Sequence, residues 1–296
     1  MKKLLLLNFL VASLLSCTNT EKKTHETPTD STENAVVAEE THKDLYGMWV
    51  GDFEPIDIKE NAENVQTNKI TLVLKSITTG DDVIGQSVVA GNSRPLNGKI
   101  VALNSKLSFV LDEPGDDKFD GRFEFKLKGD TLVGFWNAYK NTLDVTKRSF
   151  KLLKKSFTYN ANLMLSKDGD YTDWYGKKVK KVTDTVDGIT ETYENEFYRS
   201  ASKAVYELNA STANLTEKDL KNLRKLDLQI LRNTIFARHG YTFKKKNYRQ
   251  FFNPVEWYVP VTNNVDGQLT NIEKKNIKLL ERFEKYAEDN YDTFGR

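Results

Sequence analysis

The sequence predicts an α+β protein, in which an N-terminal antiparallel β-barrel or meander of about eight strands precedes a small, mainly helical C-terminal domain. In residues 44–155 apolar and polar side chains alternate with a period of two, as in strands with one buried and one wet face. Turn-forming pairs separate these runs. After residue 211, apolar residues recur at helical spacing between helix-capping motifs instead.

The composition excludes several classes of function. Lys and Arg total 44 and Asp and Glu total 42, so the chain has no overall basic field and no nucleic acid is expected as a partner. Of the 3 histidines, His25 and His42 lie in a polar N-terminal stretch, which leaves His239 for the folded part. We therefore expect no histidine metal centre and no cofactor.

Residues 1–16 have the order of a bacterial export signal, with Lys2 and Lys3 ahead of a short apolar run and Ser16 before Cys17. The run is shorter than the roughly 20 residues of a spanning helix. A cysteine at this place is typical of a lipoprotein signal, in which the thiol is acylated, for example with palmitate. The alternatives are an ordinary secretory signal or a buried N-terminal strand.

Lipidation at Cys17 predicts an extracytoplasmic protein whose first partner is the membrane. Thr18 stands where an aspartate would favour the inner membrane, so we expect the outer membrane, on a side that the sequence does not indicate. With Cys17 acylated, no thiol remains for disulfides or catalysis. Residues 17–43, rich in Thr, Glu and Lys, are predicted to be the lipidated cysteine and a flexible tether, or else a segment that folds on binding.

Residues 44–155 are predicted to form the barrel-like domain, with hairpin turns at Asn97-Gly98 and Gly129-Asp130. The opening Gly47-x-Trp49 resembles the start of lipocalin-like barrels, which implies a small ligand in the barrel mouth. In the other interpretation the interior is filled by aromatic side chains, namely Phe123, Phe125, Phe135 and Trp136.

Residues 156–210 are predicted to be a connecting mixed segment, with a hairpin through Asp187-Gly188 and helical spacing from 197 to 208. Residues 211–296 are predicted to form the helical domain. A capping box at Thr216–Asp219 opens a helix that runs to Gly240, and a second box at Thr270–Glu273 opens the last helix.

The run Ile230–Tyr241 is similar to the signature of the YARHG domain, with Phe236 where the name has tyrosine. Further positions agree in order downstream: Phe251-Phe252, Trp257-Tyr258, Pro260, Leu269, Glu273 and Asn276. The resemblance covers residues 211 to 286. It implies an extracytoplasmic module of bacterial envelope proteins and supplies no reaction.

The motif contains the candidate binding or structural residues, while no catalytic and no metal-binding residue is assigned. They are Arg232, Asn233, Arg238, His239, Gly240, Trp257, Tyr258 and Glu273. On a helical wheel Arg238 falls among apolar positions, so it needs a carbonyl or carboxylate partner, with Asp227 and Glu273 as candidates. These residues either pin the helix end in place or form a small site for an anionic or sugar ligand.

Three functions follow. The leading hypothesis is a lipid-anchored envelope protein that binds without catalysing, its C-terminal module docking an envelope protein or a cell-wall component. The first alternative is a carrier of a small apolar ligand in the barrel. The second is a hydrolase using His239, for which no nucleophile motif or paired acid is present.

Overall fold

The computed structural model describes residues 39–104 and 106–287. The predicted signal peptide, Cys17 and most of the predicted tether lie outside the described residues. The last tether residues contact the barrel, because the Thr41 amide donates to the Ile77 carbonyl at 2.7 Å. A 3₁₀ turn, η1 (Lys43–Leu45), leads into the first strand. No helix in the described ranges is long and apolar enough to cross a bilayer.

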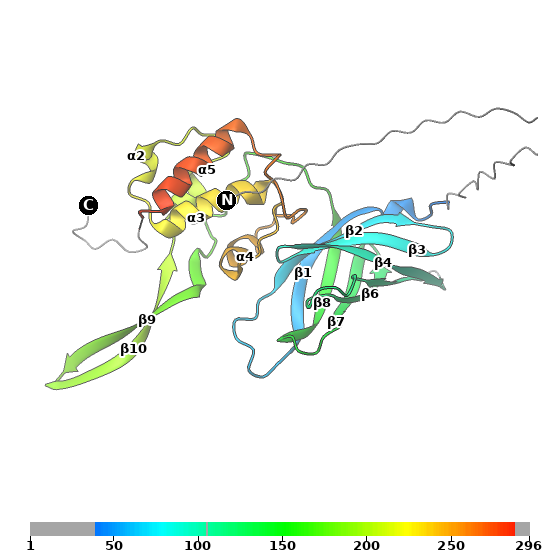
Figure 1. Ribbon diagram of the computed structural model, residues 1–296, viewed down its shortest axis with the longest axis horizontal. Helices are drawn as coiled ribbons and strands as arrows, with labels where there is room; N and C mark the ends of the chain where they lie inside the picture. Colours follow the sequence, from blue (N-terminus) through cyan, green and yellow to red (C-terminus); the bar gives the residue numbers. More distant parts are fainter. Residues whose placement is uncertain (1–38, 105, 288–296) are drawn as a thin grey trace, which may run out of the picture. The chain divides into compact units, whose positions relative to one another are not determined.

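Eight antiparallel strands form a closed barrel in which each strand pairs with its sequence neighbour and β8 returns to β1 (Figure 1). They are β1 (Gly47–Ile58), β2 (Asn68–Ile77), β3 (Asp82–Val89), β4 (Asn92–Leu103), β5 (Lys106–Asp112), β6 (Gly121–Lys128), β7 (Thr131–Ala138) and β8 (Val145–Lys155). Strand pairing satisfies the backbone hydrogen bonds around the ring and leaves no edge strand. The predicted fold class is confirmed.

The period of two places every second side chain inside the barrel. Phe109 stacks on Phe125 with ring centroids 4.7 Å apart, and Phe53, Phe123 and Phe150 surround them. Trp136 also faces inward, but the prediction that Phe135 helps to fill the interior is wrong. Neighbouring residues on a strand point to opposite faces, and Phe135 is 44% exposed.

One predicted hairpin turn is confirmed and the other is wrong. Gly129, with φ of 61°, starts the turn between β6 and β7. Asn97 and Gly98 instead lie inside β4, and the turn before it falls at Ala90-Gly91, both with positive φ. Gly98 allows the backbones of β4 and β5 to approach closely, since a Cβ there would lie 2.0 Å from the Val110 carbonyl oxygen.

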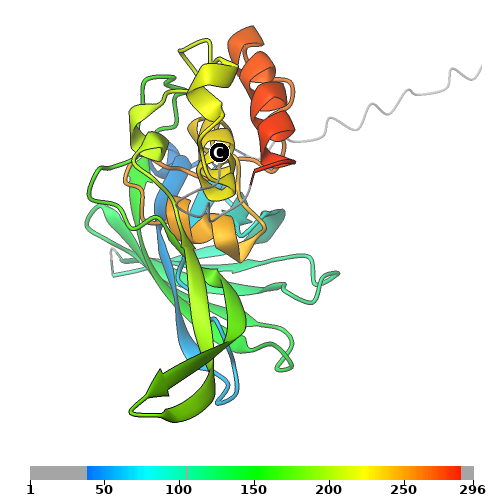
Figure 2. The same cartoon turned by 90° about the vertical axis from the view of Figure 1, so that its left-hand side faces the viewer.

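The predicted hairpin at Asp187-Gly188 is confirmed as the ribbon of β9 (Thr172–Val186) and β10 (Ile189–Ser200), which is seen end to end in Figure 2. The expected helical start at 197 is wrong, because Phe197 pairs with Lys178 and only α1 (Ala204–Glu207) is helical. The base of the ribbon packs on the helical region. There the buried Asp173 accepts hydrogen bonds from Asn247 and Gln250.

The helical region contains α2 (Glu217–Leu220), α3 (Lys225–Arg238), α4 (Lys246–Phe252) and α5 (Asn271–Glu284). Both predicted capping boxes are present. The single helix expected to run to Gly240 is broken before α3, because the Asp227 carboxylate accepts from the Arg224 amide at 2.9 Å and caps a new helix. Gly240, with φ of 71°, ends α3 as predicted.

The barrel and the segments that follow it belong to one compact unit. The Lys69 ammonium, on the outside of β2, donates to the Val255 carbonyl at 2.5 Å, and the Gly91 amide donates to the Thr242 hydroxyl at 3.1 Å. Burial and the nearby Lys155 lower the pKa of Lys69 to about 8. These bonds place α4 beside the open end of the barrel.

Candidate functional site

Polar side chains of the C-terminal motif form a buried cluster around Glu273. One oxygen of this carboxylate accepts from His239 Nε2 at 2.8 Å and from the Thr270 amide at 2.9 Å. The other accepts from the Tyr159 hydroxyl at 3.0 Å, and the Tyr159 ring stacks on His239 at 4.2 Å. Since a carboxylate only accepts, Nε2 of His239 carries the hydrogen.

The hydrogen bonds keep Glu273 ionised. Burial alone would raise the pKa of this carboxyl, but the donors His239, Thr270 and Ser211 outweigh burial and lower the pKa to about 2. Glu273 is 0% exposed and His239 is 2% exposed. A cluster that is closed to solvent and satisfied internally stabilises the domain and presents no face to a ligand.

Arg238 is buried, as the helical wheel predicts, but Asp227 is not its partner. Its Nε donates to the Leu163 carbonyl at 2.7 Å and its Nη1 donates to the Ser211 hydroxyl at 3.0 Å. Burial lowers the pKa of Arg238 to about 10, although the negative charge of Glu273 acts to raise it. The guanidinium therefore joins α3 to the segment that precedes it.

The remaining predicted site residues do not converge on one place. Arg232 pairs with Glu284 of α5, and the Asn233 side chain donates to the Gln229 carbonyl of its own helix. Trp257 Nε1 donates to the Met164 carbonyl at 2.8 Å and the Tyr258 hydroxyl donates to the Tyr241 carbonyl at 2.7 Å. The geometry thus supports the interpretation in which the motif pins the helix end in place.

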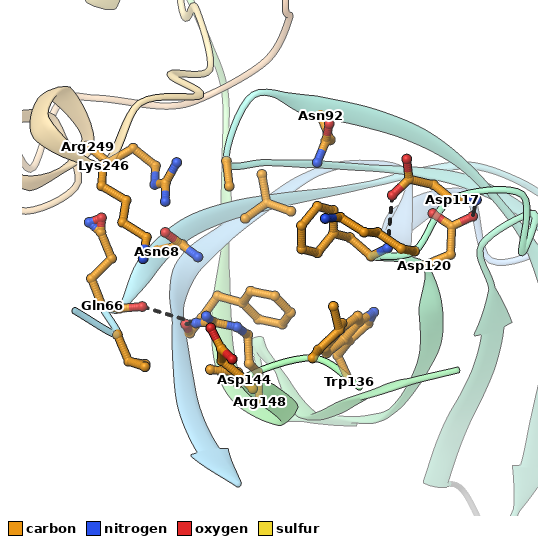
Figure 3. A pocket seen from close by; sticks show the side chains of 18 of the residues that line it. Gln66, Asn68, Asn92, Asp117, Asp120, Trp136, Asp144, Arg148, Lys246 and Arg249 are labelled. Atoms are coloured by element: carbon orange, nitrogen blue, oxygen red, sulfur yellow. Dashed lines mark hydrogen bonds between the residues drawn. The ribbon is translucent and has the colours of Figure 1, made fainter. Parts of the chain in front are cut away.

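A cavity of about 600 Å³ opens at one end of the barrel, above the aromatic core (Figure 3). Its floor is formed by Phe53, Phe123 and Trp136. Figure 3 shows Lys246 and Arg249 on one side and Asp117 and Asp120 on the opposite side. The barrel is therefore filled at one end and hollow at the other. The cavity has the size of small-molecule sites, but its rim is strongly polar.

Two acids of the cavity wall, Asp120 and Glu113, are hydrogen-bonded within the protein. Asp120 accepts from Arg94 Nε at 2.9 Å and from Nη2 at 2.6 Å, in a two-pronged ion pair. Glu113 accepts from the Ser87 hydroxyl at 2.8 Å, the Gly121 amide at 2.8 Å and Trp136 Nε1 at 3.1 Å. Burial raises the pKa of Glu113, which these donors oppose.

The opposite wall carries two guanidinium groups whose hydrogen-bond acceptors in the described ranges are all backbone carbonyls. Nη1 of Arg148 donates to the carbonyls of Phe53 at 2.8 Å and Gln66 at 3.2 Å. Arg249, 8% exposed, donates to the Lys244 carbonyl. Burial first, and then repulsion by Arg249, lowers the pKa of Arg148 to about 10, and burial also lowers the pKa of Arg249.

Three atoms that line this cavity are buried without a hydrogen-bond partner in the described part of the chain. They are Gln66 Oε1, Asn68 Oδ1 and Arg249 Nε. An unmet buried polar group costs about 1–3 kcal/mol, so such groups call for an explanation. Their gathering at one cavity fits a polar ligand that completes them.

This cavity was not predicted from the sequence, although strand parity carries a signal for it. Asn68 continues the inward set of Ile70 and Leu72, and Arg148 continues the inward set of Phe150 and Leu152. Polar side chains that extend an apolar inward series mark the end at which a barrel opens. Arg249 gives no such signal, because it lies on α4, far along the chain.

In the described ranges, no group of three or more His, Cys, Asp and Glu side chains is placed to hold a metal ion. The cavity offers an aromatic floor, an ion-paired acidic wall and two arginines with spare donors, which suits recognition of a polar ligand.

No curated protein and no solved structure matches the chain. A scan against protein families matches residues 202–285 to the YARHG domain, a range that includes α1 to α5 and begins ahead of residue 211. The helices α1 to α5, their caps and the buried cluster around Glu273 all lie within residues 202–285, apart from Tyr159 and Leu163. Residues 202–285 of this chain are therefore a YARHG domain, C-terminal to an eight-stranded barrel.

Proposed function

We propose that this is a lipid-anchored, extracytoplasmic binding protein of the cell envelope, without catalytic activity, whose barrel holds a small molecule at its open end. The observation that carries the proposal is the cavity of about 600 Å³ with its unpartnered buried polar atoms. The YARHG domain supports this end of the barrel through α4. We place the binding role in the barrel and not in the YARHG motif, because the side chains of Arg238, His239 and Glu273 are buried.

The other expectations for the domain stay predictions. Docking of an envelope protein or a cell-wall component has no exposed site among Arg238, His239, Tyr258 and Glu273, whose polar atoms bond inside the protein. A hydrolase using His239 has the same difficulty, since its ring lies between Tyr159 and Glu273. A purely apolar ligand suits the polar rim of the cavity poorly.

Blocking the cavity is expected to remove a bound molecule. Native mass spectrometry of the full chain, purified gently from its own envelope fraction, should show a stoichiometric adduct. In Asn92→Trp the adduct should be lost, because Asn92 stands on the rim and a large ring there fills the space. Val101→Trp, on the same strand but facing outward and 56% exposed, should keep it. An adduct that survives in Asn92→Trp would contradict binding at this place.

The anchor is tested separately. Cys17→Ser should move the chain from the membrane fraction to the soluble fraction, with loss of the acyl mass from the intact protein, because acyl chains supply the membrane affinity. An unchanged mass and unchanged fractionation would contradict lipidation at Cys17.

A further inference from the structure

Arg148 and Arg249 form a pair of like charges at one wall of the cavity. Among the described residues, the hydrogen bonds of these two guanidiniums run to backbone carbonyls, and no carboxylate is within ion-pair distance of either. Elsewhere in the same cavity Arg94 has Asp116 and Asp120 as ion-pair partners. The contrast shows that the fold can supply carboxylates to a cavity arginine and does not do so here.

Arg249 is buried and Arg148 is half-buried, and two such cations without a counter-charge are unfavourable in the free protein. A buried charge is stable when it is paired, and here repulsion by Arg249 adds to burial in lowering the pKa of Arg148. Arg249 is more than nine-tenths buried, and its Nε has no hydrogen-bond partner in the described part of the chain. An anion between the two groups would supply the missing charge and accept from that nitrogen.

The rest of the cavity defines the other features of such a ligand. Gln66 Oε1 and Asn68 Oδ1, both unpartnered acceptors, suit a hydroxyl or amine next to the anionic group. The floor of Phe53, Phe123 and Trp136 suits a ring or a short apolar portion. Of the acids that line the cavity, Asp120 is paired with Arg94 and Glu113 is held by three donors. The others, Glu63, Asp117 and Asp144, are exposed, so solvent screens their repulsion of an anion.

We propose that the barrel cavity recognises a small organic anion, with its carboxylate or phosphate group held between Arg148 and Arg249 and its ring or apolar part against Trp136. This inference rests on the proposed binding function and names the class of ligand. The two arginines are specificity-determining residues, and Asn68 and Gln66 bind the polar group beside the charge.

The test compares four small ring compounds on the full chain by saturation-transfer NMR and calorimetry. Benzoate and phenyl phosphate are the two anionic probes, benzyl alcohol is neutral and benzyltrimethylammonium is cationic. At least one anionic probe should bind about tenfold or more tightly than the neutral and cationic ones, as expected for a charge-assisted contact. The better of benzoate and phenyl phosphate distinguishes the carboxylate from the phosphate.

Arginine variants locate the effect. Arg148→Gln and Arg249→Gln should each weaken the anionic probe about 10- to 100-fold, the range of a hydrogen bond to a charged group. The affinity of Arg148→Lys for the anionic probe should lie between those of the parent protein and Arg148→Gln, because lysine keeps the charge but lacks the two-pronged guanidinium. Arg122→Gln is the matched control, since Arg122 pairs with Asp112 on the outer face of β6 and should bind like the parent protein. Melting curves identify any variant that fails to fold, in which case Arg148→Lys carries the comparison.

The outcomes separate this inference from the binding function. Equal affinity for benzyl alcohol and the anions, with both blocked by Asn92→Trp, would overturn the anionic class and leave the binding function standing. Anion binding that neither arginine variant weakens would also overturn it. If none of the four probes binds, the anionic class is overturned. The binding function is then decided by native mass spectrometry of the parent protein and Asn92→Trp.

Discussion

Replacing Glu273 with alanine is expected to destabilise the YARHG domain by about 3–5 kcal/mol, a large part of the roughly 5–15 kcal/mol that stabilises an ordinary domain. The change removes the acceptor for donors from His239, from the Tyr159 hydroxyl, and from the amide and hydroxyl of Thr270. Because the site is fully buried, water cannot replace the lost carboxylate without opening the cluster. The loss of the α5 capping box adds to the cost.

Denaturant unfolding followed by circular dichroism measures this cost, with Glu281→Ala as the control. Glu281 has the same charge on the same helix but is exposed, so its substitution should change the free energy of unfolding by less than about 0.5 kcal/mol. Equal effects of the two substitutions would show that the buried cluster does not stabilise the domain.

The same carboxylate gives the domain a defined acid sensitivity. The pKa of Glu273 lies at about 2 in the folded protein, below the ordinary value of 4.5. Its contribution is therefore complete above the ordinary pKa and is lost as the pH falls from about 4.5 towards 2, by about 3 kcal/mol in all. Glu273→Gln should lack this component, so its stability relative to the parent should improve over that pH window.

The barrel was accessible to sequence reasoning because one rule, alternation, decides most of it. The inward series of Phe123 and Phe125 and the turn at Gly129 were enough to place β6 and β7. The same rule identifies the error at Phe135, since Phe135 and Trp136 are neighbours and cannot both point inward. Parity must be followed along a strand before aromatic side chains are assigned to a core.

The site was less accessible because its parts come from distant segments. Tyr159 lies 114 residues before Glu273, and its hydroxyl bonds to Glu273 without any local pattern to show it. Arg249 reaches the barrel mouth from α4. The motif residues were found by resemblance, and their burial, which decides between a binding site and a structural cluster, follows only from the packing of the whole domain.

Gly98→Ala is expected to open the barrel between β4 and β5, with a loss of about 3 kcal/mol or more in the free energy of unfolding. The added Cβ would lie 2.0 Å from the Val110 carbonyl oxygen and 2.8 Å from Leu111 Cα, both backbone atoms that can move only if the strands part. Since a closed barrel depends on every strand pair, one broken ladder exposes two edges and the aromatic core.

Gly129→Ala is the matched comparison, because it separates the two roles of glycine. Gly129 needs its positive φ for a turn, but a Cβ there meets nothing within 4 Å, so alanine should cost only about 1–2 kcal/mol. Both variants are measured by denaturant unfolding followed by tryptophan fluorescence, to which Trp49 and Trp136 in the barrel interior contribute. If Gly98→Ala costs no more than Gly129→Ala, β4 is not pressed against β5. Asn97-Gly98 would then be replaceable by any strand-forming pair, and the sequence pair that suggests a turn would have no structural role.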